Sequence, residues 1–508
     1  MKALLNIQNW FLETVGSVDL ETIQNWFIYN PKQPLLFNSS LFLGLFLIFY
    51  FIYILSRNTH YFRVTYVVLF SLFFYYKSSG HYFWILIFSS VVDYSLSRLI
   101  YVEAQQFYRK FYLVLSLLIN LGMLAYFKYT NFFIDNYNTL FDGNMKFEDI
   151  VLPVGISFYT FQTLSYTIDV YRRELEPTKS FMDFLFFVSF FPQLVAGPIV
   201  RASDFIPQIY EKLKLTKEDF NRALFLIIGG LLKKAVISDF ISSNFVDRVF
   251  DAPNSYTAFE NLMASYGYAI QIYCDFSAYS DIAIALALLL GYQLPSNFNN
   301  PYTAKSITQF WNTWHQSLSR WLKDYVYIPL GGNRNGKIKQ FFNLLFTMLI
   351  GGLWHGASLK FIFWGGFHGF ELIVDKIIQK WSNNWKFKNY SVVKFVSIIF
   401  TFHLVSFAWI FFRANTFNDG IQLLYQIKNH FIPSAQFLTA FLFNYNWVIF
   451  WIGTVFIGQF LFDYIHDFIL KILFKSSWWT LTIITAVIVF ILFQFSSIPN
   501  QPFIYFYF

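Results

Sequence analysis

Long runs of apolar residues, separated by short polar segments, recur along the whole chain. Such runs predict transmembrane helices, because a helix needs about 20 apolar residues to cross the hydrocarbon core of a bilayer. Several runs are too short to cross fully and others contain Gly and Pro, so we expect about eleven full spans plus re-entrant or interfacial helices buried in protein. The runs cover residues 35–56, 62–77, 81–100, 111–127, 150–170, 181–200, 222–238, 257–273, 277–294, 341–359, 361–374, 395–412, 437–463 and 479–495.

Composition supports this interpretation. Of the 508 residues, 56% are hydrophobic and 13% are charged, whereas soluble domains carry roughly 25% charged residues. The alternating ten-residue segments of a transmembrane barrel are absent from the sequence. We therefore predict an all-α polytopic membrane protein with a single domain at residues 35–508.

Residues 1–34 form a separate N-terminal extension in which IQNWF occurs twice, at 7–11 and 23–27. The repeat predicts two short amphipathic stretches that place Trp10 and Trp26 at the membrane interface. The extension lacks the basic start and the apolar core of a cleaved signal peptide. We expect it to be retained and to be dispensable for chemistry.

The net charge of +8 comes from basic residues in short loops between the apolar runs. This distribution does not indicate nucleic-acid binding. The segments 320–339 and 376–394 are both rich in Lys and Arg, which favours a cytoplasmic position for each. The two runs between them, 341–359 and 361–374, then form a hairpin that enters from the cytoplasm. The single cysteine, Cys274, excludes an internal disulfide and a thiolate metal cluster, and we interpret it as buried and inert.

Histidines are the first candidates for chemistry. His355 and His368 each lie inside a Gly-x-x-x-Gly pattern within an apolar run. The glycine spacing lets helices pack closely, but it does not explain the histidines. A buried imidazole is kept neutral because burial disfavours the charged form, and a neutral imidazole can act as a general base. Four other histidines lie near span ends: His60, His81, His430 and His466. We predict that His403 is a core residue bonded to a backbone carbonyl.

His315 belongs to a segment, 307–325, whose apolar residues recur at helical spacing. The pattern predicts one amphipathic helix that ends before Pro329 and the Gly331-Gly332 pair. His315 falls at the border of the apolar and polar faces. An interfacial histidine and a catalytic one are equally compatible with this position.

Two other segments are more polar than a plain span requires. One contains Asp275 and Asp281. The other contains Gln162, Ser165 and Asp169 on one helical face. These residues either line a polar cavity or tie helices together. A metal site is not expected without a His-x-x-x-His pair, and a serine hydrolase is not expected without a Gly-x-Ser-x-Gly turn.

Several stretches, taken in order, resemble the membrane-bound O-acyltransferase family, in its bacterial branch typified by the alginate O-acetylation membrane protein. They are LPVGISFYTFQTLSYTIDVYR, FFPQLVAGPIVR, the long segment from YCDFSAYSD to IPLGGNR, GGLWHGAS, FAWIFFRA and the terminal PFIYFYF. The stretch WLKDYVYIPLGGNR resembles the alginate branch more closely than the related D-alanyl-teichoic-acid branch. The extension 1–34 and Tyr507 depart from the family pattern.

The resemblance implies a ring of membrane helices around a central tunnel, where an activated acyl group meets an acceptor. By motif, His355 would be the essential histidine and His315 the second family histidine. We assign His355 as general base and His315 as a helper at the acyl carbonyl. Residues expected to bind substrate or line the tunnel are Asn312, Asp324, Asp275, Asp281, Gln162 and Ser165.

The resemblance also implies the reaction and its partners. The donor would be a cytoplasmic thioester, acetyl-CoA or an acyl carrier, with no bound cofactor. The acceptor would be an extracytoplasmic polysaccharide, an alginate-like polymer or peptidoglycan. A partner acetyltransferase outside the membrane would finish the transfer, and the chain would lie in the bacterial inner membrane. The alternatives are a transporter of the acyl group or polymer and a scaffold without covalent chemistry, since intramembrane polar residues also fit a pathway.

Overall fold

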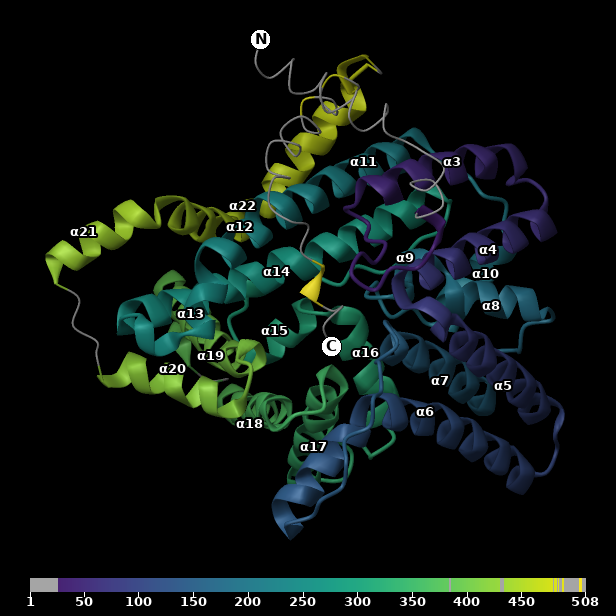
Figure 1. Ribbon diagram of the computed structural model, residues 1–508, viewed down its shortest axis with the longest axis horizontal. Helices are drawn as coiled ribbons and strands as arrows, with labels where there is room; N and C mark the ends of the chain where they lie inside the picture. The colour runs from purple at the N-terminus through teal and green to yellow at the C-terminus, as the bar shows by residue number, and fades with distance from the viewer. Residues whose placement is uncertain are drawn as a thin grey trace.

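Helices form every regular element in the part of the chain that the structure describes (Figure 1). The computed structural model describes residues 26–382, 385–429, 434–477, 479–481, 483, 487 and 502–504. The α-helices are α3 (Ser40–Ser56), α4 (His60–Ser79), α5 (Phe83–Val102), α6 (Gln106–Phe141), α7 (Ile156–Arg172), α8 (Phe181–Ser189), α9 (Phe191–Leu194), α10 (Ala202–Tyr210), α11 (Lys217–Leu231), α12 (Asp239–Ile241), α13 (Asp247–Asp251), α14 (Ala258–Leu289), α15 (Ile307–Thr313), α16 (Gln316–Leu322), α17 (Lys337–His355), α18 (Leu359–Ser382), α19 (Ser391–Arg413), α20 (Phe417–Asn429), α21 (Ala435–Asn444) and α22 (Asn446–Lys475). The predicted all-helical class is confirmed. Of the predicted N-terminal extension, Trp10 lies outside the described residues and Trp26 is 38% exposed.

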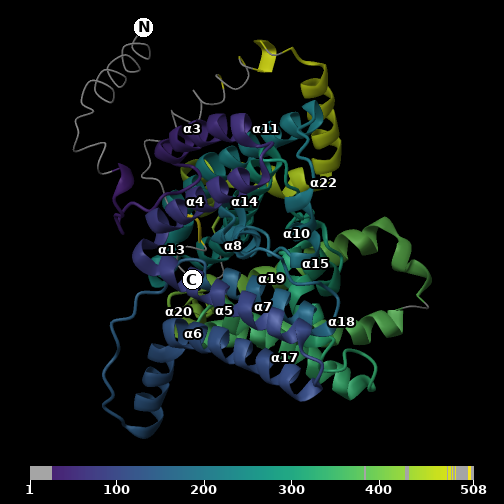
Figure 2. The ribbon, with the colours of Figure 1, turned by 90° about the vertical axis from the view of Figure 1, so that its right-hand side faces the viewer.

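Among the described residues, 5 helical segments are long and apolar enough to cross a membrane. They are His60–Val102, Gln106–Phe141, Ala258–Leu289, Ser391–Arg413 and Asn446–Lys475. In the apolar window of α14, 94% of the residues are buried, against 17% for α6 and 11% for α22. The helix α14 accordingly crosses the middle of the molecule, while α6 lies at its edge in both views (Figures 1 and 2). The exposed apolar faces of α6 and α22 suit contact with lipid.

Two predicted spans, 257–273 and 277–294, are wrong because the chain forms one helix of 32 residues across them. The polar residues around Asp275 suggested an interruption. In the structure Asp275 stays within the helix and forms an ion pair with Lys234, at 2.7 Å. Because Lys234 pairs with the carboxylate inside the protein, Asp275 does not need a solvent-exposed loop, and the helix continues through it.

Other span boundaries also differ from the prediction. Residues 181–200 do not form one span: the short helices α8 and α9 are followed by a buried, non-helical stretch. Residues 437–463 are divided at Tyr445 into α21 and α22. The expectation of short helices buried in protein is met by α8 and α9, whose residues pack in the core.

The runs predicted as a hairpin form α17 and α18, which turn at residues 356–358 and pack against each other. Their insertion from the cytoplasm stays a prediction. A Cβ atom on Gly352 would lie 2.2 Å from the carbonyl oxygen of Phe361, and one on Gly365 would lie 2.3 Å from that of Met348. Glycine is therefore required at both positions for the two backbones to meet. At 24 residues, α18 is longer than the predicted run 361–374.

The continuous helix predicted for 307–325 is wrong. The chain instead forms α15, a break at Trp314 and His315, α16, and a π-helical turn at Lys323–Tyr327. His315 adopts a left-handed conformation with φ 43° and ψ 53°, which no helix interior accommodates. Its ring is fully buried, so the interfacial position that the pattern allowed is also wrong.

Candidate active site

His355 is the last residue of α17 and lies deep in the protein, 4% exposed. Three aromatic rings surround its imidazole: those of Trp354, Trp364 and Phe412, with ring centroids at 4.9, 5.1 and 5.1 Å. All three contacts are edge-to-face, at interplanar angles between 74° and 84°. This arrangement fixes the plane of the imidazole. His315, His368 and Lys128 are its titratable neighbours within electrostatic range.

The C-terminal end of α17 is held by two side chains of α6. The ammonium of Lys128 donates to the carbonyl of Trp354 at 2.6 Å, and the hydroxyl of Tyr129 donates to the carbonyl of Leu353 at 2.6 Å. The last carbonyls of a helix have no partner within it, and a cation there also interacts favourably with the helix dipole. The backbone that carries His355 is therefore fixed by a helix far away in sequence.

Replacing Lys128 with methionine is expected to destabilise the protein and to lower its catalytic rate. The buried carbonyl of Trp354 would lose its donor, which costs about 1–3 kcal/mol. Thermal unfolding of the purified protein and the initial rate of acyl transfer measure the two effects. Lys110→Met, at an exposed position of the same helix, is the control. Equal melting temperatures for the two variants would contradict this role of Lys128.

His315 also contacts Trp354, the neighbour of His355. Its ring centroid is 6.0 Å from that of Trp354 and 4.7 Å from that of Phe276. The backbone around it is pinned by Asn297, whose carbonyl accepts from Gln316 and whose side chain accepts from the hydroxyl of Ser317, at 2.6 Å. The kink thus turns His315 inward instead of along a helix face.

His368 lies beyond Trp364 and is fully buried. The ring centroids of Trp364 and His368 are 4.9 Å apart, so Trp364 is in contact with both His355 and His368. The Nδ1 of His368 lies 2.8 Å from a carboxylate oxygen of Glu371, one turn further along α18. Trp354 thus contacts both His315 and His355, and Trp364 contacts both His355 and His368.

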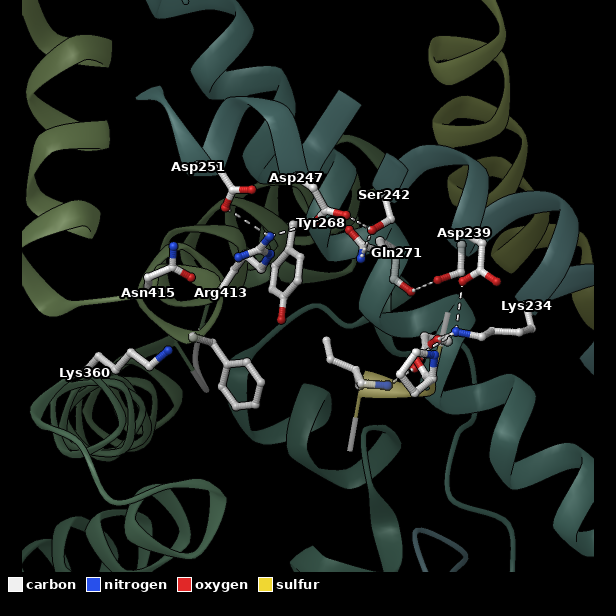
Figure 3. A pocket seen from close by; sticks show the side chains of 15 residues that line it. Lys234, Asp239, Ser242, Asp247, Asp251, Tyr268, Gln271, Lys360, Arg413 and Asn415 are labelled. Carbon is white, nitrogen blue, oxygen red and sulfur yellow. Dashed lines mark hydrogen bonds and ion pairs between the residues drawn. The ribbon is translucent and has the colours of Figure 1, made fainter. Parts of the chain in front are cut away.

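A cavity of about 490 Å³ lies beside Phe412 (Figure 3). We call it the Arg413 cavity. It is lined by Lys234, Ser238, Asp239, Ser242, Asp247, Asp251, Tyr268, Gln271, Asp275, Lys360, Phe412, Arg413, Asn415, Pro502 and Ile504.

Ion pairs occupy two sides of the Arg413 cavity (Figure 3). Arg413 pairs with Asp247 at 2.7 Å, and Lys234 pairs with Asp239 at 2.9 Å and with Asp275. Phe412 borders the cavity and also contacts His355. The ring of Phe412 therefore lies between the cavity lining and His355.

A second cavity, of about 460 Å³, lies between α15, the π-helical turn, α17 and α18. We call it the Trp311 cavity. Its cations are Lys323, Arg334 and Lys376, and no Asp or Glu is among the described residues that line it. The ring centroid of Trp311 lies 5.7 Å from that of Trp364 and 5.1 Å from that of His368. Successive ring contacts thus connect the two cavities: Trp311, Trp364, His355 and Phe412.

The other predicted site residues lie in different places. Asp275 lines the Arg413 cavity and Asn312 lines the Trp311 cavity. Asp281 pairs with Lys233 at 2.6 Å, and Asp324 pairs with Arg201; neither carboxylate lines either cavity.

The two candidates on α7 are buried and also line neither cavity. The hydroxyl of Ser165 donates to the carbonyl of Gln162 at 2.7 Å. The side-chain nitrogen and oxygen of Gln162 have no hydrogen bond among the described residues. Gln162 and Ser165 share one face of α7, and this face lies in the core beside the neighbouring helices.

The remaining histidines lie away from His355. His60 is paired with Asp183 at 3.3 Å, and His81 lies in the short 3₁₀ turn Gly80–Tyr82. His466 lies inside α22, so its predicted position near a span end is wrong. His403 bonds to the carbonyl of Ile399 at 2.7 Å, as predicted, but its side chain is exposed, so its predicted core position is wrong. His430 lies outside the described residues.

Sequence reasoning missed Lys128, Glu371 and the lining cations of both cavities. Lys128 had a signal: it is an isolated cation in the apolar helix α6. Glu371 had a weaker one, since it follows His368 by three residues and so lies on the same helix face.

Comparison with known proteins agrees with this geometry. A model of the membrane-bound O-acyltransferase family matches residues 72–415, and the chain belongs to this family. The peptidoglycan O-acetyltransferase of Helicobacter pylori is 37% identical over 420 residues, covering 77% of this chain and 79% of that protein. A probable alginate O-acetylase of Pseudomonas aeruginosa is 41% identical over 307 residues, covering 60% of this chain and 57% of that protein. The teichoic acid D-alanyltransferase of Bacillus subtilis is 29% identical over 284 residues, covering 53% and 71%. The chain is thus an O-acyltransferase of a multi-pass membrane type.

Proposed function

We propose that this chain moves an acetyl group from a cytoplasmic thioester to a hydroxyl group, for O-acetylation of an extracytoplasmic polysaccharide. The observation that carries the proposal is the position of His355. It lies in continuous ring contact between two cavities of different charge. His355 itself lines neither cavity, and we propose that donor and acceptor approach its imidazole past Trp364 and Phe412, respectively. Around this centre we propose a ring of about eleven membrane helices. The number comes from the apolar runs of the sequence, because a helix needs about 20 apolar residues to cross a bilayer.

The Trp311 cavity suits the donor. Coenzyme A and acyl carriers both present phosphate on a long, thin arm, and Lys and Arg side chains bind phosphate. Three cations without an acidic residue in the described lining fit such a group. Two of them, Lys323 and Arg334, belong to the basic segment 320–339, for which the positive-inside tendency favours the cytoplasm. The acyl end would then point along Trp311 toward His355.

His355 would act as the general base. Its imidazole takes the proton of the acceptor hydroxyl as the hydroxyl oxygen attacks the carbonyl carbon of the thioester. The carbon–sulfur bond then breaks, and the imidazolium returns the proton to the departing thiolate. His315, across Trp354, would orient the acyl carbonyl or stabilise its developing negative charge. Asn312 and Asp275 would contact donor and acceptor from the two cavities.

The acceptor is proposed from the names of the relatives. Their names refer to peptidoglycan, alginate and teichoic acid, all of which are polymers that lie outside the cytoplasm. We propose a polysaccharide of this class as the final acceptor, a partner acetyltransferase that completes the transfer outside, and a position in the bacterial inner membrane.

The experiment that tests the proposal measures O-acetyl content in two fractions, released polysaccharide and purified cell wall. Cells that lack this chain are compared with the same cells carrying it. The fraction that loses its acetyl groups identifies the acceptor. Unchanged O-acetyl content in both fractions would refute the proposal.

Replacing Lys323 and Arg334 together with glutamine is expected to raise the KM for acetyl-CoA about tenfold, with kcat little changed, because both side chains would bind phosphate rather than the reacting atoms. Release of free thiol from acetyl-CoA by the purified protein measures both constants. The control is Lys339→Gln, in the same basic segment but outside the cavity lining. A KM that stays at the wild-type value would place the donor elsewhere.

A further inference from the structure

The helix α18 carries a row of buried ionisable side chains that the proposed reaction does not use. His368, Glu371 and Asp375 follow at spacings of three and four, so they share one face of the helix. They are 0%, 6% and 8% exposed. The carboxylate of Asp375 accepts from the backbone N–H of Thr308 at 2.9 Å, which anchors α15 on this face. Asp375 thus has a structural role, whereas the first two residues bond to each other.

Stability does not explain the pair of His368 and Glu371. Burying two ionisable groups is costly, and well-packed apolar side chains in their place are often neutral or stabilising. The Nε2 of His368 and the Oε1 of Glu371 are also buried without a hydrogen bond among the described residues. A purely structural pair would not carry that additional cost.

The position of the pair indicates its role. The ring of His368 contacts Trp364 on one side, and Trp364 contacts His355. On the other side it contacts Trp311, which lines the Trp311 cavity, at an interplanar angle of 90°. His368 is therefore the common neighbour of the indole beside the base and the indole beside the donor. A carboxylate bonded to one ring nitrogen fixes the orientation of an imidazole.

We infer that Glu371 and His368 form a positioning pair for the acyl-transfer step. Glu371 fixes the imidazole of His368. That ring packs edge-to-face against the indoles of Trp364 and Trp311, at interplanar angles of 81° and 90°, and so holds both in place. His355 thereby keeps one orientation toward the acyl carbon arriving from the Trp311 cavity. The pair touches neither substrate nor the reacting atoms. The inference rests on the proposed donor side and on His355 as the base.

The variants that test it are Glu371→Gln, which keeps the side-chain volume, His368→Gln, and the two combined. Each is compared with Asp375→Asn, one turn further along the same buried face. The assay is thiol release from acetyl-CoA by membranes, corrected for the amount of each variant, with His355→Ala as the reference for zero catalysis. Loss of orientation by about 1 Å costs roughly a hundredfold in rate.

Both single variants are expected to lower kcat tenfold to a hundredfold and to leave the KM for acetyl-CoA within about twofold. The double variant should be no slower than the slower single variant, because residues that act as one unit are not additive. Asp375→Asn should keep kcat within about twofold, because the asparagine oxygen can still accept from the backbone N–H of Thr308 that anchors α15, and the pair itself is unchanged. If Glu371→Gln does not reach the membrane, His368→Gln alone tests the inference, with the same expected changes in kcat and KM.

Other outcomes overturn the inference. A raised KM with normal kcat would mean that the pair serves donor binding, and additive losses would mean that the two residues act separately. If His355→Ala is as active as wild type, the proposed function fails and the inference fails with it. If His355→Ala is inactive while both pair variants are normal, only the inference fails.

Discussion

Replacing His355 with alanine is expected to abolish acyl transfer while the protein remains in the membrane at wild-type abundance. The imidazole contacts both Trp364, which leads to the Trp311 cavity, and Phe412, which lines the Arg413 cavity. Loss of a positioned general base costs about 10²–10⁴ in rate. Thiol release from acetyl-CoA and the O-acetyl content of polysaccharide and cell wall measure the effect, with membrane levels matched by immunoblot.

His403→Ala is the matched control for this prediction. His403 lies on the long apolar helix α19 and bonds to the carbonyl of Ile399, away from both cavities. Its replacement is expected to leave the rate within about twofold, as for most exposed substitutions. His355→Gln, which fills more of the aromatic cage, separates loss of the base from loss of packing. Persistent acetylation in both His355 variants would favour a conduit or a scaffold over an enzyme.

Replacing Gly352 with alanine is expected to produce the largest loss of stability. The new Cβ atom would lie 2.2 Å from the Phe361 carbonyl oxygen and 3.1 Å from the Cα of Gly365, both of them backbone atoms. One helix of the hairpin must then move away from the other, and overpacking of this kind costs about 1–3 kcal/mol, occasionally more. Since His355 lies one turn further along α17, activity should fall as well. Thermal unfolding of the purified protein and the rate of thiol release report the two effects.

Gly453→Ala is the control for the hairpin variant. Gly453 also lies in an apolar helix, α22, but a Cβ atom there meets no heavy atom within 4 Å. Alanine should be neutral or slightly stabilising at that position, because it lowers the entropy of the unfolded chain. Equal melting temperatures for the two glycine variants would show that the contact between α17 and α18 can relax.

The features that the sequence predicts well are local. The all-helical fold follows from apolar runs, and the hairpin of α17 and α18 follows from glycine spacing between two basic segments. Both depend on residues close together in the chain. Burial of His355 was predicted for the same reason, because it lies inside an apolar run.

The features that the sequence does not reveal are imposed from elsewhere in the fold. The kink at His315 requires a left-handed residue, and Asn297 stabilises it through hydrogen bonds that no helical periodicity encodes. Lys128 supports the backbone beside His355 from 226 residues away in sequence. The role of Trp311 depends on the break before α16, which brings α15 against α18.

The layer of aromatic side chains around His355 has a consequence for the cell as well as for the reaction. No residue lines both the Arg413 cavity and the Trp311 cavity, and the interval between them is filled by the rings of Trp364, His355 and Phe412. A layer of closely packed aromatic rings hinders the passage of hydrated ions. On the proposed function, the enzyme would thus pass a two-carbon group across the membrane while the proton gradient on which the cell depends is preserved.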